Sequence, residues 1–94
     1  MKAPTKREPW HPAEWDTPEA LAIKSLATGT ANDIQQKLAL RWIIEKVAMT
    51  YDQSFVPDDP NGRVAAFIEG RRSVGNQIVK LMRVDLNALE KKNG

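Results

Sequence analysis

The longest helical pattern of apolar positions lies between Asp59 and Val84. At about 100° per residue, its apolar side chains fall on one broad side, as expected of a helix packed against a core. Asp59 is expected to be the N-cap and Pro60 the first helical residue, which predicts a helix over about 60–83. Gly75 lies within this stripe, and a glycine inside a helix implies that a second helix comes close. The apolar residues are Val64, Phe67, Ile68, Val74, Ile78, Val79, Leu81 and Met82.

Two apolar stripes mark the segment of about 31–50, which we predict to be a second long helix. Thr30 to Asp33 resembles a capping box and marks its start. A helix with two apolar sides is covered on both. We expect the helix over 60–83 on one side, and on the other the N-terminal segment, the first helix or another subunit. One stripe contains Leu40, Ile43, Ile44, Val47 and Tyr51, and the opposite one contains Leu38, Trp42 and Met49.

A shorter helix over about 18–28 is predicted before them. Thr17 offers a capping hydroxyl, Pro18 suits the first helical position, and Gly29 suits the left-handed end. Residues 1–17 contain three prolines and should form an extended arm. Trp10 and Trp15 lie in this arm and are typical anchors for a groove, either on the chain's own helices or on a neighbouring subunit.

The remaining segments connect or end these helices. In the loop 51–59, Tyr51 and Phe55 are expected to tuck under the two long helices. Asp85 is expected to cap a short turn within 85–94, followed by a frayed tail. The pattern therefore predicts an all-α fold: an extended Pro/Trp-rich N-terminal arm on 1–17, and a helical domain over 18–84 with a short helix and a long antiparallel helical hairpin.

Composition narrows the class of protein. A chain of 94 residues forms one domain and buries only about 60–65% of its unfolded surface, so oligomerisation would help it. The absence of cysteine excludes disulfides and thiolate chemistry. The chain lacks an apolar run long enough for a membrane span, and it lacks a signal-peptide pattern, so we expect no membrane association and a cytosolic location where it is made.

Candidate chemistry is sparse. His11 is the only histidine, and the spacing of Asp52, Asp58 and Asp59 lacks the pattern of a calcium loop, so we expect no metal and no cofactor. With no nucleophile–base pair or phosphate-binding loop, we expect no catalytic residues and a protein that binds rather than catalyses.

Charge is unevenly distributed along the chain. Residues 61–84 carry five basic side chains and one acidic one, whereas 51–60 carry three acidic ones. Either the loop and the helix attract one another, or the helix offers a basic face to phosphates. Arg71 lies near the middle of the apolar stripe, and Arg72 lies at its edge. Arg71 is expected either to form an internal ion pair with Glu45 or Asp52 or to contact a partner chain or nucleic acid.

Two sequence elements resemble a family of small helical proteins from the structural-gene region of tailed, mainly short-tailed, bacteriophages. The first is YDxSF, at Tyr51, Asp52, Ser54 and Phe55. The second is FxEGRRxVG, at Phe67, Glu69, Gly70, Arg71, Arg72, Val74 and Gly75. The resemblance covers roughly residues 38–83 and leaves out the arm. It supplies a context near capsid and portal genes but no catalytic residues.

Three hypotheses follow from the residues and the resemblance together. The first is a virion-associated structural or assembly protein, present in the host cytoplasm during assembly and then in the virion. It would bind a capsid, portal or tail component, and possible self-association is part of this hypothesis; its partner-binding residues would be Trp10, Trp15, Trp42, Arg71 and Arg72. The second is a DNA-binding accessory of genome packaging that uses Arg63, Arg71, Arg72, Lys80 and Arg83. The third, an enzyme or lytic factor, lacks the required residues.

Overall fold

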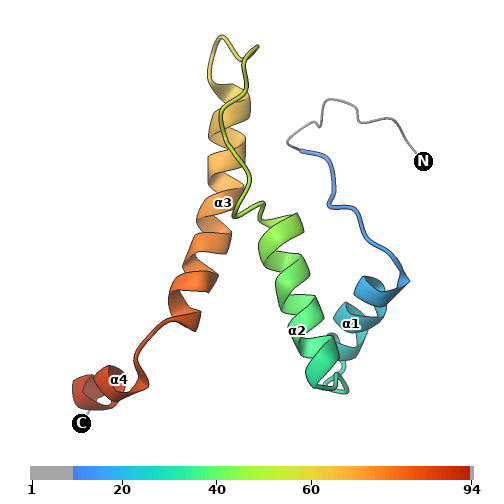
Figure 1. Ribbon diagram of the computed structural model, residues 1–94, viewed down its shortest axis with the longest axis vertical. Coiled ribbons are helices and arrows are strands. Elements are labelled where there is room, and N and C mark those ends of the chain that lie inside the picture. Colours follow the sequence, from blue (N-terminus) through green and yellow to red (C-terminus); the bar gives the residue numbers. More distant parts are fainter. Residues whose placement is uncertain (1–9, 94) are drawn as a thin grey trace.

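The computed structural model describes residues 10–93, with side chains placed through residue 89. Its described part is helical and contains no strand, so the all-α fold class is confirmed. The helices are α1 (Thr17–Ala27), α2 (Asp33–Trp42), the π-helical turn η1 (Ile43–Val47), α3 (Arg63–Met82) and α4 (Leu86–Asn93) (Figure 1). The predicted arm lies outside the described residues over 1–9. Its residues 11–16 continue without helix into α1.

The first two helices form the most extensive contact in the fold (Figure 1). Gly29, at φ 74°, turns the chain between them, as expected from its position. Each helix buries one alanine completely, Ala22 in α1 and Ala39 in α2. Small residues at these positions allow the two helices to approach closely.

The caps differ from those expected, because other side chains complete a better set of hydrogen bonds. Asp16, not Thr17, is the N-cap of α1, and its N–H donates to Glu19 Oε1 at 3.0 Å. Asn32, not Thr30, caps α2 through a reciprocal pair: Gln35 N donates to Asn32 Oδ1 at 2.8 Å and Asn32 N donates to Gln35 Oε1 at 3.0 Å. Thr30 N instead donates to Ser25 O at the end of α1.

The second long helix ends sooner than residue 50. After Trp42 the chain continues as η1, in which Ala48 N donates to Ile43 O at 2.8 Å. Met49 then takes the left-handed conformation, at φ 51°, and Thr50 donates to Ile44 O through both N and Oγ1. These bonds satisfy the last carbonyl groups and turn the chain into the loop 51–62.

The third helix begins at Arg63 rather than at Pro60. Gly62, at φ 66°, is the N-cap, because Asp59 to Gly62 form a turn closed by Gly62 N to Asp59 O at 3.1 Å. Asp59, the first residue of this turn, still caps the helix through its side chain. Its carboxylate accepts hydrogen bonds from Val64 N at 3.2 Å and Ala65 N at 2.9 Å.

Of the helices described, α3 packs against η1 alone (Figure 1). Of its predicted core stripe, Ile68 is buried, as is Gly75 beside it, while Phe67, Val74, Leu81 and Met82 are exposed. The expected hairpin of two long helices is therefore limited in this structure to the contact at η1.

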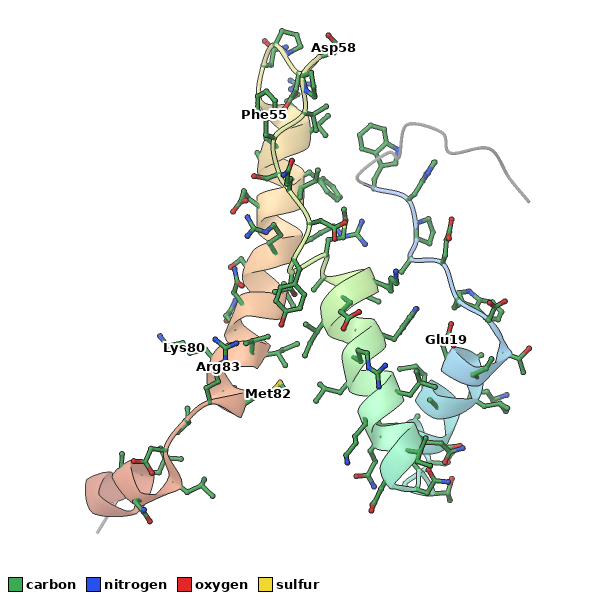
Figure 2. All side chains as sticks on the ribbon, in the orientation of Figure 1. Glu19, Phe55, Asp58, Lys80, Met82 and Arg83 are labelled. Carbon is green, nitrogen blue, oxygen red and sulfur yellow. The ribbon has the colours of Figure 1, made fainter. Side chains whose placement is uncertain are left out.

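Tyr51 and Phe55 do not tuck under the helices, which corrects the prediction. They are 67% and 75% exposed. Phe55 lies on the loop that runs beside the first half of α3 (Figure 2). Just after η1, Thr50, 3% exposed, packs against Gly75 of α3 instead, and this contact is too close to admit an aromatic ring.

The C-terminal segment is more regular than the short turn expected there. Asp85 caps it as predicted, since its Oδ1 accepts a hydrogen bond from Asn87 N at 2.9 Å. The helix α4 then continues to Asn93 and, within the described residues, packs against no other helix. None of the helices between residues 10 and 93 has the length and apolar character that a membrane crossing requires.

Candidate functional site: a tryptophan-lined groove

An open apolar groove of about 620 Å³ lies between the arm, η1 and α3. It brings together three tryptophans that are far apart in the sequence. The arm contributes one wall, the end of α2 and η1 form the floor, and α3 forms the opposite wall. The lining residues are Trp10, His11, Pro12, Ala13, Trp15, Trp42, Ile43, Val47, Ala48, Phe67, Arg71 and Val74.

Two tryptophans attach the arm to the helices, in addition to a hydrogen bond from Arg71. Trp42 Nε1 donates to Glu14 O at 2.9 Å, which joins α2 to the arm. Trp10 contacts Phe67 of α3 edge to face, with ring centroids 6.4 Å apart and planes at 79°. Such aromatic pairs are worth about 0.5–1.5 kcal/mol beyond the area they bury. Within the described residues, the arm thus docks on its own chain. Trp42, on the second apolar stripe of its helix, contacts the arm, which is one of the contacts expected for that stripe.

Trp10 and Trp15 keep a large free surface despite these contacts. They are 58% and 64% exposed, whereas Trp42 is only partly exposed. Trp15 also lines a second hollow of about 250 Å³ with Trp42, Ile23 and Ala20. Two aromatic rings standing over apolar hollows can bury further area against an apolar segment of another molecule.

Arg71 stands at the groove wall and bonds to main-chain oxygens rather than to the expected Glu45 or Asp52. Its Nε donates to Val47 O at 2.8 Å, and its terminal nitrogens donate to Lys46 O and His11 O, both at 3.4 Å. The carbonyl groups at the end of a helix carry partial negative charge, which favours a cation there. Arg71 therefore links α3, the end of η1 and the arm.

Arg72 bonds within the chain as well. Its Nε donates to Thr50 O at 3.1 Å, and its Nη1 forms an ion pair with Glu69. The Ser54 hydroxyl and the Arg72 guanidinium lower the pKa of the Glu69 carboxyl below its usual value. The YDxSF and FxEGRRxVG elements therefore meet in space. Arg71, at the groove wall, and Arg72 both bond α3 to the end of η1 and the residues that follow it.

The other cations proposed for nucleic acid do not gather into one patch. Arg63 begins α3 and Arg83 follows its last residue, so about 30 Å of helix separates them. Lys80 and Arg83 lie together at the C-terminal end (Figure 2). Arg72 is already paired with Glu69.

The groove has the chemistry of a binding surface. Among its lining residues only His11 and Arg71 are titratable, and Arg71 bonds to carbonyl groups. In the part of the chain that the structure describes, no three His, Asp or Glu side chains are placed to hold a metal ion. The apolar lining of the groove can exclude water from an apolar side chain of another molecule, and main-chain carbonyl groups of the arm and η1 lie beside it.

Sequence reasoning identified the three tryptophans but missed the wall that completes the groove. Phe67 and Val74 were assigned to the core, although they line this surface. A helix wheel gives one broad apolar side and does not distinguish the part that packs from the part that stays open. The π turn at η1, which places Ile43 and Val47 on the floor, has no clear signal in the sequence.

Comparisons with protein-family models, with curated proteins and with solved structures found no match to this chain.

Proposed function

We propose that this chain is a non-enzymatic structural or assembly protein of a bacteriophage particle, and that it binds a capsid, portal or tail component through the tryptophan-lined groove. The observation that carries the binding role is the pair of exposed rings, Trp10 and Trp15, over apolar hollows. The phage context comes from the resemblance of the YDxSF and FxEGRRxVG elements. The protein would act in the host cytoplasm during assembly and then in the virion.

The proposal gives the predicted arm and hairpin distinct roles. The arm, ending at Asp16, presents Trp10 and Trp15, and Trp42 supports it through the bond to Glu14 O. The hairpin of α2 with η1 and α3 forms the rest of the groove. Arg71 and Arg72 act mainly by holding the hairpin, since they bond to the carbonyl groups of Val47 and Thr50.

The chemistry of the groove defines the partner segment. It would insert one or two aliphatic or aromatic side chains between Trp15 and Phe67, with polar groups at the rim. A few buried aromatic anchors carry most of the free energy of such contacts.

Quantitative mass spectrometry of density-purified phage particles tests the virion role. A fixed copy number near a symmetry value of the head or tail is expected of a structural component. Absence of the chain from purified particles would contradict a virion role and leave a transient assembly factor.

Photo-crosslinking tests the surface itself. A benzophenone amino acid at position 15 should capture one capsid, portal or tail protein in assembling particles. The same residue at position 34 is the control, because Ile34 is 77% exposed and does not line the groove. Equal capture from both positions would argue against the groove as the binding surface.

The alternative, a DNA-binding accessory of genome packaging, has one supporting feature: Lys80 and Arg83 are exposed at the same end of α3. Two cations predict a weak salt dependence, because the slope of log affinity against log salt is about 0.9 per phosphate contacted. Tight binding to duplex DNA that falls steeply between about 50 and 200 mM salt would require contacts to more phosphates than these two cations reach, and it would favour the alternative.

A further inference from the structure

The C-terminal half of α3 has an apolar side that nothing in the described chain covers. Val74, Leu81 and Met82 are 54%, 73% and 58% exposed. Beyond its contact with η1 this half of the helix diverges from α2, and Met82 extends on the α2 side of α3 in the view of Figure 2. Val74 lies two turns before Leu81 and Met82, and Ile78 on the turn between them is partly exposed.

Side chains along this side of α3 have the alternating spacing that is typical of two helices packed side by side. Phe67, Arg71, Val74, Ile78 and Leu81 recur at alternate steps of four and three residues. This pattern places side chains along one seam against a second helix running beside the first. Phe67 and Arg71 line the tryptophan groove, and Val74 lies where the groove meets the rest of the seam. The part beyond the groove contains Ile78 and Leu81, with Met82 next to Leu81 in sequence.

The solvent-accessible area of the chain is larger than that of a compact monomer of the same mass. The chain exposes 7798 Å², whereas a compact monomer of 10.6 kDa exposes about 5,500 Å². The ten residues outside 10–93 account for at most about 1,600 Å², the area they would have in an unfolded chain, which leaves about 6,200 Å² for residues 10–93. A compact chain of that length exposes about 5,000 Å², so an excess of about 1,200 Å² remains. A stable interface takes about 800 Å² from each partner.

Charge favours one orientation of the helix pair. Residues 61–84 carry five basic side chains and one acidic one, so a parallel pair would set Lys80 and Arg83 against the same residues of the other copy. An antiparallel pair centred on Ile78 avoids this, since it sets Lys80 at the level of Asn76 and Arg83 at the level of Ser73. The same register brings Val74 to the level of Met82.

We propose that the Val74–Met82 half of α3 is a self-association surface, on which a second copy of this chain packs the same segment in antiparallel orientation about Ile78. The contact buries Val74, Ile78, Leu81 and Met82 of both copies. It covers Val74, one lining residue of the tryptophan groove, but leaves Trp10 and Trp15 free, so partner capture at position 15 and self-association are tested separately.

Sedimentation velocity of the full chain over a range of concentrations tests the association. A dimer is expected, and Leu81→Lys should weaken it by at least about a hundredfold, because two leucines are lost and two cations enter the seam. Ile34→Lys is the matched control, because Ile34 is about as exposed as Leu81 but lies at the start of α2. A monomer at all concentrations, or equal weakening by both variants, would overturn the proposal.

Orientation is tested by disulfide formation, since the chain contains no cysteine. Mixing Val74→Cys with Met82→Cys should give the mixed disulfide in preference to either self-linked form. Preferred self-linking of Val74→Cys would show a parallel pair and overturn the antiparallel arrangement. Far-UV circular dichroism verifies that each variant is folded, and Met82→Lys replaces Leu81→Lys if the latter is not.

Discussion

At the scale of single residues, Gly75 sets how closely α3 meets the end of η1. A Cβ added at this position would overlap Thr50 Oγ1 and would lie 2.9 Å from Ala48 Cβ. Thr50 is held in place because its Oγ1 donates to Ile44 O at 2.7 Å, and Arg72 donates to its carbonyl group. Thr50 cannot move away without breaking its buried hydrogen bond to Ile44 O.

Gly75→Ala should therefore lower the free energy of unfolding by about 1–3 kcal/mol, the usual cost of overpacking. The matched control is Gly70→Ala in the same helix, where a Cβ would meet nothing within 4 Å. That variant should be more stable by about 0.5–1 kcal/mol, because alanine favours a helix over glycine. Urea denaturation followed by circular dichroism measures both. Similar effects of the two changes would show that Gly75 is not a point of close contact.

Glu69 supplies a pH-dependent contribution at the same junction. The Ser54 hydroxyl and the Arg72 guanidinium lower its pKa from the usual 4.5. A carboxyl whose pKa is lowered on folding contributes stability that is present above the unfolded pKa and is lost as the pH falls through the folded pKa. Because Glu69 is exposed, the contribution is small.

Glu69→Gln should consequently be less stable than the parent chain at neutral pH, and the difference should disappear as the pH falls below about 4.5. Thermal unfolding measured from pH 7 to pH 3 tests this. A difference that persists unchanged at pH 3 would mean that the loss does not come from the charged carboxylate.

At the scale of elements, the helices of this protein depend on the side chains at their ends. Asp16, Asn32 and Asp85 each stand at the start of a helix. The start of α3 is different, because its N-cap is Gly62, which has no side chain to accept a hydrogen bond. Asp59 supplies the missing acceptor across the turn. A carboxylate there also favours the positive end of the helix dipole.

Asp59→Ala should lower the free energy of unfolding by about 1 kcal/mol, the typical cost of losing an N-terminal cap. Asp58→Ala removes the same charge from the tip of the loop (Figure 2) and should change stability by less than about 0.5 kcal/mol. Hydrogen exchange of the Val64 and Ala65 amides would locate the effect. If both variants lose the same stability, loop charge rather than capping is the cause.

At the scale of the whole molecule, the arm and the helices form one unit through few contacts. The bond from Trp42 Nε1 to Glu14 O and the contact of Trp10 with Phe67 are the two that define the groove. Both join parts of the chain that are distant in sequence. Because the arm supplies one wall of the groove, the groove is complete only while the arm is docked on the helices.

Trp42→Phe keeps an aromatic ring on α2 but removes the donor to Glu14 O. The loss of one hydrogen bond, about 0.5–1.5 kcal/mol, should release the arm for a larger fraction of the time. The indole N–H signals of Trp10 and Trp15 in nuclear magnetic resonance spectra should then move toward solvent-exposed positions. Tyr51→Phe, at an exposed ring outside the groove, should leave both signals in place. Unchanged signals in Trp42→Phe would show that the arm docks without this bond.

The sequence by itself determined the features that depend on local spacing. Apolar periodicity predicted three of the helices, although their ends differ by a few residues. Gly29 marked a helix end, Asp85 marked a cap, and Gly75 marked a close approach. Trp10 and Trp15 were expected to dock in a groove because large rings are unfavourable in a solvated arm, and Trp42 was expected in a contact because it lies on the second apolar stripe of its helix. In each case the physical cause lies within a few residues of the side chain.

Only the tertiary structure decided which apolar side chains are covered. Phe67 and Ile68 are neighbours with the same hydrophobic character, yet one lines a groove and the other is buried. Ile68 lies on the same side of α3 as Gly75, where Thr50 packs, whereas Phe67 faces the arm. It also decided that Arg71 bonds to carbonyl groups rather than to Glu45 or Asp52, since the end of η1 places those oxygens beside it. Burial and partner choice depend on how distant segments meet, and local spacing does not specify that.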